Sequence, residues 1–419
     1  MKIGITDQNR LDWLCTTTIH FPPLITTCAL FLCCFILSCG SGGGGSGTGG
    51  ENNAATSYEA PPGTNRELVV RSVRDIGAIG QNPLILQRDA GFSVSFQGKS
   101  QWLFGDTLLE FPNSENALML SNSLSATYDI DAGDGIAGFS EQVDTVGAPP
   151  AFFPLTEAEQ AFNASHGAEY CRQEDCLAHW HIWPGTMIVD ENKGLAYVFY
   201  RKVLVEAGPF EFSHVGHSIA VWKDSLQAPE RPVFNYVESY PTLFFSEEGE
   251  YGFGSAAVAV DDDVYVYGCE LAEDSLQKPC HLARVAFADI LDKSAWSYYG
   301  GDGNWSSDIS SSSEIFLGND MMSVFFSAYL KQFLVIYSEP FGAKAMLRSA
   351  LRPEGPRSAP MVLFSVEATE NAHGWVYDFL AHPEFSEDGG RIVYVSYSRK
   401  TDETHSQLQL VAVELGYSQ

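Results

Sequence analysis

The chain has 419 residues, of which 45% are hydrophobic and 18% charged, a composition that can bury a large core and excludes global disorder. Acidic residues outnumber Lys and Arg by 53 to 24, and the net charge is −29. Because such a surface repels nucleic acid and anionic lipid, we expect no nucleic-acid partner, and neutral or cationic partners remain.

An apolar run, Leu24 to Cys39, lies near the start of the chain. It is too short and too abruptly ended for a membrane-spanning helix, and it closes in Ile-Leu-Ser-Cys, which resembles a bacterial lipobox. We therefore expect residues 1–38 to be a lipoprotein signal peptide and Cys39 to carry the lipid. The protein would then be anchored through that lipid only, in the bacterial cell envelope, at the outer membrane or cell surface. An ordinary secretory signal and a single anchoring helix are the alternatives.

Glycine-rich sequence, Gly40 to Gly50, follows the lipobox at once. Residues 39–65 are expected to form a flexible tether that spans roughly 30 Å as a random coil. The folded domain is then residues 66–419, and we expect it to be a monomer.

Four cysteines follow the tether: Cys171, Cys176, Cys269 and Cys280. Three pairings exist in principle, and the short spacings favour Cys171–Cys176 and Cys269–Cys280 in an oxidising compartment. A zinc site is the rival interpretation, but no Cys-x-x-Cys pair is present. We expect two disulfides, no metal and no cofactor.

One pattern recurs five times in the folded domain: a small or apolar strand, a polar turn, and a strand rich in aromatic and β-branched residues. The five copies span residues 91–107, 185–202, 254–270, 323–339 and 382–400. They lie roughly 60 to 95 residues apart, which leaves room for a four-stranded sheet with its loops.

Five sheets with two apolar faces each can cover both faces by packing radially, so the sequence predicts an all-β, five-bladed β-propeller. A strand at Leu408 to Leu415 or one at Arg66 to Val73 would complete a blade and close the ring. A β-sandwich is the alternative, but it does not require five related hairpins at this spacing. In a propeller the hairpin turns fall on one rim, and the strand starts and ends fall on the other.

The first copy runs through Trp-Leu-Phe almost directly into Asp106, although a carboxylate at the end of an apolar strand costs desolvation energy unless it is paired, solvated or used. We expect a hairpin turn of two or four residues centred on Gly98 and Lys99. Gly91 then lies opposite Asp106, and Asp89 lies on the diagonal, on the same face. A three-residue turn would instead send the two carboxylates to opposite faces.

Paired carboxylates are what glycoside cleavage requires, one protonated to help the leaving oxygen depart and one ionised to activate water or to attack. Their repulsion and partial burial would raise one of the two pKa values and so separate these roles. The alternative is structural: Asp106 caps a turn with Thr107, and Asp89 pairs with Arg88 or a loop amide.

Several motifs, in their order along the chain, bear on this choice. The stretches RDAGFSVSF…WLFGDT, SNSLSATYD, WPG, ARV…WSYYGG, LRSALRPEGP and AHPEFS…VSYSRK resemble a bacterial five-bladed propeller family, long catalogued as a domain of unknown function, in which some members are endo-D-arabinanases. The resemblance covers residues 67–418. It implies acids around an axial pocket, and by position these are Asp89 of "RD-G" and Asp106 of "FGDT".

Two positions depart from the family pattern. Thr186 follows Trp-Pro-Gly where the family often has an acid, and Asp320 stands where a Glu often precedes the next strand. If either acid is needed for turnover, this protein would bind a glycan without cutting it.

Other residues at strand starts and ends are candidates to bind the sugar. His181 and Trp183 alternate along one strand and so share a face, where Trp183 could stack on a sugar ring; a packed Trp beside a hydrogen-bonded His is the alternative. Glu270 is either a third acid or part of a disulfide-tied loop. The predicted substrate-binding residues are His181, Trp183, Glu270, Asp320, His382 and Arg399.

The sequence therefore predicts a glycoside hydrolase that acts on an arabinan-like or other furanosidic polysaccharide through Asp89 and Asp106. Asp89 is assigned as base or nucleophile and Asp106 as its partner or acid, and these roles could be exchanged. The alternative function is a non-catalytic glycan-binding or envelope-scaffolding propeller.

Overall fold

The computed structural model describes residues 67–167, 171, 176–208, 211–270, 278–340, 342–366 and 376–418. The chain divides into two units, Met1–Ser57 and Tyr58–Gln419, and all the described residues belong to the second. The predicted signal peptide (residues 1–38), the lipidated Cys39 and the tether (residues 39–65) lie outside the described residues.

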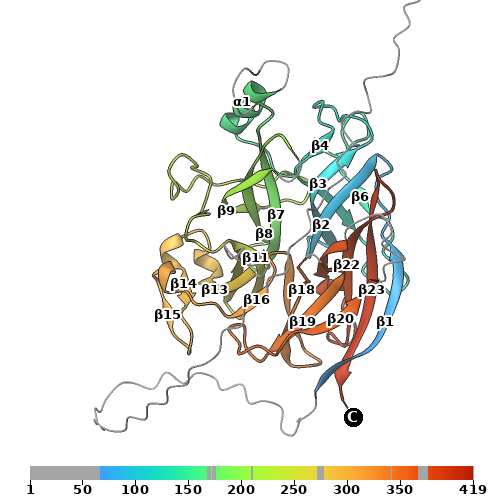
Figure 1. The fold of residues 1–419 in the computed structure, drawn as a ribbon, viewed down its shortest axis with the longest axis vertical. Helices are drawn as coiled ribbons and strands as arrows, with labels where there is room; N and C mark the ends of the chain where they lie inside the picture. Colours follow the sequence, from blue (N-terminus) through green and yellow to red (C-terminus); the bar gives the residue numbers. More distant parts are fainter. Residues whose placement is uncertain are drawn as a thin grey trace, which may run out of the picture. The chain divides into compact units, whose positions relative to one another are not determined.

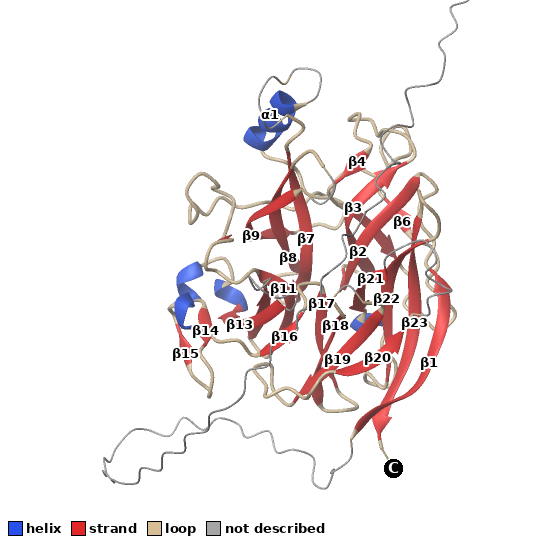
Figure 2. Ribbon diagram, in the orientation of Figure 1, coloured by secondary structure: helices blue, strands red, loops and turns tan. Residues whose placement is uncertain are grey.

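Antiparallel strands form five sheets (Figures 1 and 2). The first sheet contains β2 (Ile85–Phe96), β3 (Lys99–Leu109), β5 (Ser123–Thr127) and β6 (Ser140–Glu141), with β4 (Met119–Leu120) also paired to β3. The second contains β7 (His179–Asp190), β8 (Leu195–Val205), β9 (Phe212–Trp222) and β10 (Phe245–Ser246). The third contains β11 (Phe253–Val260), β12 (Asp263–Cys269), β13 (Lys278–Ala286), β14 (Ser297–Tyr299) and β15 (Trp305–Ser306), with β16 (Phe316–Gly318) also paired to β13.

The last two sheets complete the set. The fourth contains β17 (Met322–Ser327), β18 (Gln332–Ser338), β19 (Lys344–Ala350) and β20 (Met361–Ser365). The fifth contains β21 (Val376–Ala381), β22 (Ile392–Lys400), β23 (Ser406–Tyr417) and β1 (Leu68–Ala78). Helical structure among the described residues is limited to α1 (Glu157–His166) and the short 3₁₀ helices at Phe287–Asp289, Lys293–Ala295, Ile309–Ser311 and Pro383–Phe385.

The first strands of the five sheets form the inside of a ring. β2 contacts β7, β7 contacts β11, β11 contacts β17, β17 contacts β21, and β21 returns to β2. Each sheet is therefore one blade, and the predicted all-β, five-bladed β-propeller is confirmed.

The ring closes by pairing the two ends of the folded domain. β1 runs antiparallel to β23, from Leu68 opposite Tyr417 to Ala78 opposite Gln409. Both predicted closing segments thus belong to the fifth blade, where β23 is the third strand and β1 is the fourth. The main-chain hydrogen bonds between them tie the start of the folded domain into its last blade, and the chain then continues from β1 into β2 of the first blade.

The apolar core is divided into layers that lie between neighbouring blades. Trp102 of the first blade packs with Tyr394 of the fifth, and Phe199 of the second packs with Phe253 of the third. The other three pairs of neighbouring blades share equivalent clusters. In β8, all five residues from Ala196 to Tyr200 are buried, because both faces of the strand are covered.

Bulges interrupt the inner strands near their starts. The pairing register shifts next to Ala90 in β2, between Pro184 and Met187 in β7, near the start of β11, and between Tyr377 and Leu380 in β21. A bulge bends the strand and re-aims a side chain. In four of the five blades, a bulge therefore changes the direction of side chains at the rim where the inner strands begin.

Gly185 lies in the β7 bulge and permits a close approach of the second and third blades. A Cβ at this position would lie 2.6 Å from the carbonyl oxygen of Gly254 and 3.3 Å from that of Phe199. Both neighbours are backbone atoms, so the strands would have to separate to accept a side chain.

We expect Gly185→Ala to lower the free energy of unfolding by about 1–3 kcal/mol, because the added methyl overpacks the contact between inner strands. The measurement is the thermal unfolding midpoint. Gly80→Ala is the matched control, since a Cβ at Gly80 meets no atom within 4 Å. Equal midpoints for the two variants would contradict the close approach.

Candidate active site

Asp89 and Asp106 come from the two strands of the first hairpin, but not in the predicted register. The turn is the two-residue pair Gln97–Gly98, since Phe96 lies opposite Lys99. The bulges then place Ala90 opposite Phe104 and Arg88 opposite Thr107. The expectation that Gly91 lies opposite Asp106 was therefore wrong.

The bulge nevertheless brings the two carboxylates together. The backbone of Asp106 lies close enough to the Asp89 carboxylate to oppose the rise of its pKa, and a Cβ at Gly105 would lie 2.3 Å from Asp89 Oδ1. Glycine at position 105 is thus required for this carboxylate to lie against the neighbouring strand.

The side-chain partners expected in the structural alternative are engaged elsewhere. Arg88 turns to the other side of the strand, where its Nη1 donates to Ser125 Oγ at 2.7 Å and pairs with Glu141 at 3.3 Å. The Thr107 hydroxyl bonds the Gly105 carbonyl and Ser123 rather than the Asp106 carboxylate. Neither expected partner neutralises Asp89 or Asp106.

A third aspartate, Asp378 of β21, joins this pair from the fifth blade. Its Oδ2 accepts the backbone N–H of Ala90 at 2.7 Å, and the residue is 7% exposed. Both Ala90 and Asp378 have positive φ, 61° and 56°, which marks strained backbone at the two bulges. Sequence reasoning missed Asp378 because the fifth repeat was taken to begin at His382. The signal was present, since Asp378 interrupts an apolar strand just as Asp89 does.

Crowding of these acids disfavours their ionised forms. Burial raises the pKa of Asp89 well above its usual value, and the charges of Asp378 and Asp106 raise it further, although backbone N–H groups oppose the shift. Burial also raises the pKa of Asp378, against the Ala90 hydrogen bond. A carboxyl that holds a proton beside one that does not is the arrangement acid–base chemistry uses.

Asp106 is held from the second blade. Its Oδ1 accepts the indole N–H of Trp183 at 2.8 Å and lies 3.1 Å from His181 Nδ1. His181 is buried, whereas Trp183 is partly exposed. The predicted shared face of these two residues thus serves to orient Asp106.

Asp320 is the centre of an ion-pair cluster between blades. It pairs with Arg201 of β8 and with Lys278 of β13. Burial alone would raise the pKa of Asp320, but these two cations hold that pKa far below its usual value. Asp320 is thus an ionised, neutralised carboxylate.

Glu270 follows Cys269 at the end of β12. The predicted disulfides Cys269–Cys280 and Cys171–Cys176 are both confirmed, which removes the zinc alternative for these four cysteines. Burial and then Glu247 raise the pKa of Glu270.

Glu247, in the loop after β10, was not predicted from the sequence. Its Oε2 lies 3.5 Å from Nδ1 of the buried His217, and neither atom has a hydrogen-bond partner in the part of the chain described. Burial lowers the pKa of His217 well below its usual value, so this histidine is neutral.

His382 lies in the core, whereas Arg399 is partly exposed. His382 is fully buried, stacked on Trp102 at 3.9 Å and bonded to Ser93 and Ser396, so it is removed from the candidate binding residues. Arg399 lies opposite Val376 near the start of the strand that carries Asp378 and is partly exposed.

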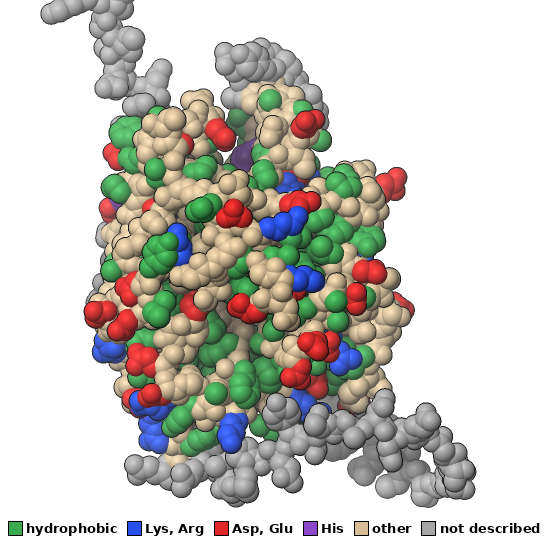
Figure 3. All heavy atoms as spheres, turned by 180° about the vertical axis from the view of Figure 1, so that it is seen from behind, with side chains coloured by type: hydrophobic (Ala, Val, Ile, Leu, Met, Phe, Trp, Pro, Cys, Tyr) green, Lys and Arg blue, Asp and Glu red, His purple; other side chains and the backbone are tan. Residues whose placement is uncertain are grey.

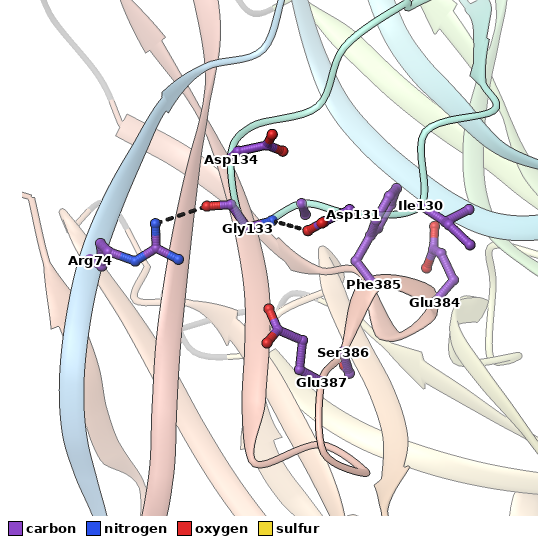
Figure 4. Close-up of a pocket in the computed structure, with 10 residues that line it drawn as sticks. Arg74, Ile130, Asp131, Gly133, Asp134, Glu384, Phe385, Ser386 and Glu387 are labelled. Carbon is purple, nitrogen blue, oxygen red and sulfur yellow. Dashed lines mark hydrogen bonds between the residues drawn. The ribbon is translucent and has the colours of Figure 1, made fainter.

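A separate hollow of about 710 Å³ lies away from these acids (Figure 4). It is lined by Arg74, residues 130–134 and residues 384–387. Arg74 donates to the Gly133 carbonyl at 2.9 Å, and Glu384 accepts from the Ser100 hydroxyl at 2.7 Å. None of the predicted site residues lines it.

Two properties of the described residues complete this account. No group of three or more His, Cys, Asp or Glu side chains among them is arranged to hold a metal ion. No helix among them is long and apolar enough to cross a membrane. On the face shown in Figure 3, Lys and Arg side chains are dispersed among acidic and hydrophobic ones.

Fold and site together define a five-bladed β-propeller with acids gathered where the inner strands begin. The chain belongs to the family described as Domain of unknown function (DUF5005), whose model matches residues 88–411. This confirms the family resemblance predicted from the motifs. No curated protein matches the chain.

Solved structures share the fold at low sequence identity. A putative hydrolase from Bacteroides ovatus is 16% identical, with 86% of this chain and 97% of that chain covered and a TM-score of 0.50. The GH43_1 enzyme from Xanthomonas citri is 12% identical, with 82% and 90% covered and a TM-score of 0.45. An α-L-arabinofuranosidase from Clostridium thermocellum is 12% identical, with 75% and 83% covered and a TM-score of 0.40.

Asp378→Asn should stabilise the protein at pH 8 by about 1–3 kcal/mol, because an amide still accepts from Ala90 and never ionises. The raised pKa means that protonated Asp378 favours folding below about pH 4, and this contribution is lost as the pH rises through the raised value. The gain in thermal midpoint should therefore vanish near pH 4. Asp262→Asn, in the exposed β11–β12 turn, is the control and should change the midpoint little at either pH. A lower midpoint for Asp378→Asn than for wild type at pH 8 would contradict the electrostatic crowding of the acids.

Proposed function

We propose that the protein hydrolyses glycosidic bonds of an arabinan-like or other furanosidic polysaccharide, with Asp89 and Asp106 as the paired carboxylates. The observation that supports this most is their closeness at the bulged start of the first blade, where Asp89 Oδ1 lies against Gly105 and Asp378 bonds Ala90. Each of the three acids lies on a different strand and interrupts it. Together they form one cluster whose buried carboxylates lower the stability of the fold. Strain and unfavourable charge of this kind are typical of functional sites.

Asp89 acts as the base or nucleophile toward the anomeric carbon, and Asp106 is its carboxylate partner. Trp183 and His181 fix the position of Asp106 through hydrogen bonds to one carboxylate oxygen. The partly exposed indole of Trp183 then offers its ring to a sugar face, and Arg399 offers a guanidinium to its hydroxyls. The furanosidic substrate class rests on the family motifs, since some members are endo-D-arabinanases.

A non-catalytic glycan-binding propeller is the second candidate. Thr186 stands where the family often has an acid, and Asp320 is neutralised by Arg201 and Lys278. If turnover requires a free acid at either position, the same site would hold a glycan and leave it intact.

The purified protein should release oligosaccharides from D-arabinan, L-arabinan or fructan, detected by chromatography of the products. Asp89→Asn and Asp106→Asn should each lower this rate at least about 100-fold, because a carboxylate that reacts or orients the reacting group is lost. Asp262→Asn should retain full activity. Activity that survives both site substitutions would remove the assignment, and binding without products would support the second candidate.

We also propose that the domain is a lipid-anchored protein of the bacterial cell envelope, on the strength of the Ile-Leu-Ser-Cys sequence ending at Cys39. In a bacterial host the full chain should incorporate labelled fatty acid and fractionate with membranes. Cys39→Ser should abolish the label, and Cys34→Ser, in the same apolar run, should not. Label retained by Cys39→Ser would contradict the lipobox.

A further inference from the structure

A glycosidase needs a proton donor beside the leaving oxygen in addition to a base or nucleophile. Asp106 is poorly placed for this role, because its Oδ1 already receives Trp183 and His181. Asp320 is held in ion pairs, and Asp378 is buried against the main chain of Ala90. Asp89 is already assigned as the base or nucleophile. The acids that remain, next to the ion-pair cluster of Asp320, are Glu247 and Glu270.

The topology places Glu270 across the ring from Asp89. The inner strands follow one another in blade order around the axis, so the third blade lies on the far side from the first. Glu270 directly follows β12 of that third blade and stands at the rim where the inner strands begin. A sugar that spans the axis would therefore have Asp89 on one side and Glu270 on the other.

The position of Glu270 is fixed by its neighbours. The disulfide Cys269–Cys280 joins two residues that lie directly opposite each other in β12 and β13. The N–H of Cys269 donates to Ser255 Oγ at 3.4 Å, and Arg201 donates to the same hydroxyl at 3.4 Å. The backbone before Glu270 is thus tied to the ion-pair cluster of Arg201 and Asp320.

The side chain of Glu270 is suited to carry a proton. It is partly exposed, and among the described residues it forms no ion pair with Lys or Arg. Burial and the nearby Glu247 raise its pKa, which keeps a larger share of it protonated. Glu247 itself lies in a loop with its Oε2 buried beside His217. Its part in this proposal is to raise the pKa of Glu270.

We propose that Glu270 is the proton donor of the hydrolysis; this rests on the proposed function. Glu270 transfers its proton to the glycosidic oxygen as the bond from that oxygen to the anomeric carbon breaks, and the bonding electron pair stays on the oxygen. The anomeric carbon accepts water, whose proton passes to Asp89, or first accepts the Asp89 carboxylate, which water then displaces. When water attacks directly, Asp89 then loses its proton to solvent and solvent reprotonates Glu270. When the Asp89 ester forms first, the water that displaces Asp89 gives its proton to Glu270.

The test compares two leaving groups. D-arabinan releases an alcohol that must be protonated, whereas the 2,4-dinitrophenyl glycoside of a D-arabinofuranosyl oligosaccharide releases a phenolate that need not be. Glu270→Gln should lower kcat on D-arabinan about 100-fold or more and leave the dinitrophenyl glycoside within about tenfold of wild type. Asp89→Asn should lose both activities. Glu339→Gln is the matched control, because Glu339 follows β18 in the fourth blade as Glu270 follows β12, and it pairs with Lys344 at 3.0 Å; it should retain both activities.

Each outcome separates the two proposals. If the wild-type protein cuts neither these substrates nor L-arabinan nor fructan, the proposed function and this inference both fall. If it cuts only L-arabinan or fructan, the two leaving groups are compared on that sugar. If wild type cuts D-arabinan and Glu270→Gln cuts it equally well, or loses both substrates in parallel while its thermal midpoint is unchanged, only the Glu270 assignment falls. The leaving-group pattern appearing in Glu247→Gln instead would move the donor to Glu247 and overturn the inference.

Discussion

The constraint on which the structure depends is that every sheet has two apolar faces, and no helix among the described residues is long enough to cover either. A buried strand such as β8, with five consecutive buried residues from Ala196 to Tyr200, can lose its contact with water only if a second sheet lies on each side. Repeating that requirement for each blade leads to a closed ring, because any open end would expose a face. The core is accordingly five layers shared by neighbours, and the pairing of β1 with β23 supplies the last contact. Loss of one layer would affect the whole ring rather than one blade.

The same ring creates the candidate site. All the inner strands begin at one rim, so residues near their starts are brought together although they are far apart in the chain. Ala90 and Asp378, whose main chain and carboxylate are hydrogen-bonded, are 288 residues apart. The bulges aim these residues toward one another, at the cost of positive φ at Ala90 and Asp378 and of buried, mutually repelling carboxylates. Blade-to-blade packing holds this arrangement because Trp183 anchors Asp106 and Arg201 anchors Asp320 across blade boundaries.

The candidate site shows where sequence reasoning fails. The five repeats, the disulfides and the two aspartates of the first hairpin could be found from local pattern and spacing. The hairpin register could not, because it depends on two bulges that the alternation of apolar residues does not reveal. His382 belongs to a motif that suggested a site residue, but it packs on Trp102 inside the core. Asp378 lies in an otherwise apolar strand, and only its hydrogen bond to Ala90 of the first blade shows that it joins the site. Both outcomes depend on a neighbouring blade that lies far away in the chain.

The sequence by itself determined that the protein is all-β and five-bladed, since apolar alternation, turn residues and repeat spacing are local properties that each blade carries in full. It also determined which cysteines are close enough to pair. Only the tertiary structure decided which acids are free, which are neutralised and which are crowded. The physical reason is that charge–charge interaction and desolvation act through space, so a carboxylate such as Asp320 acquires its character from Arg201 and Lys278 on other strands.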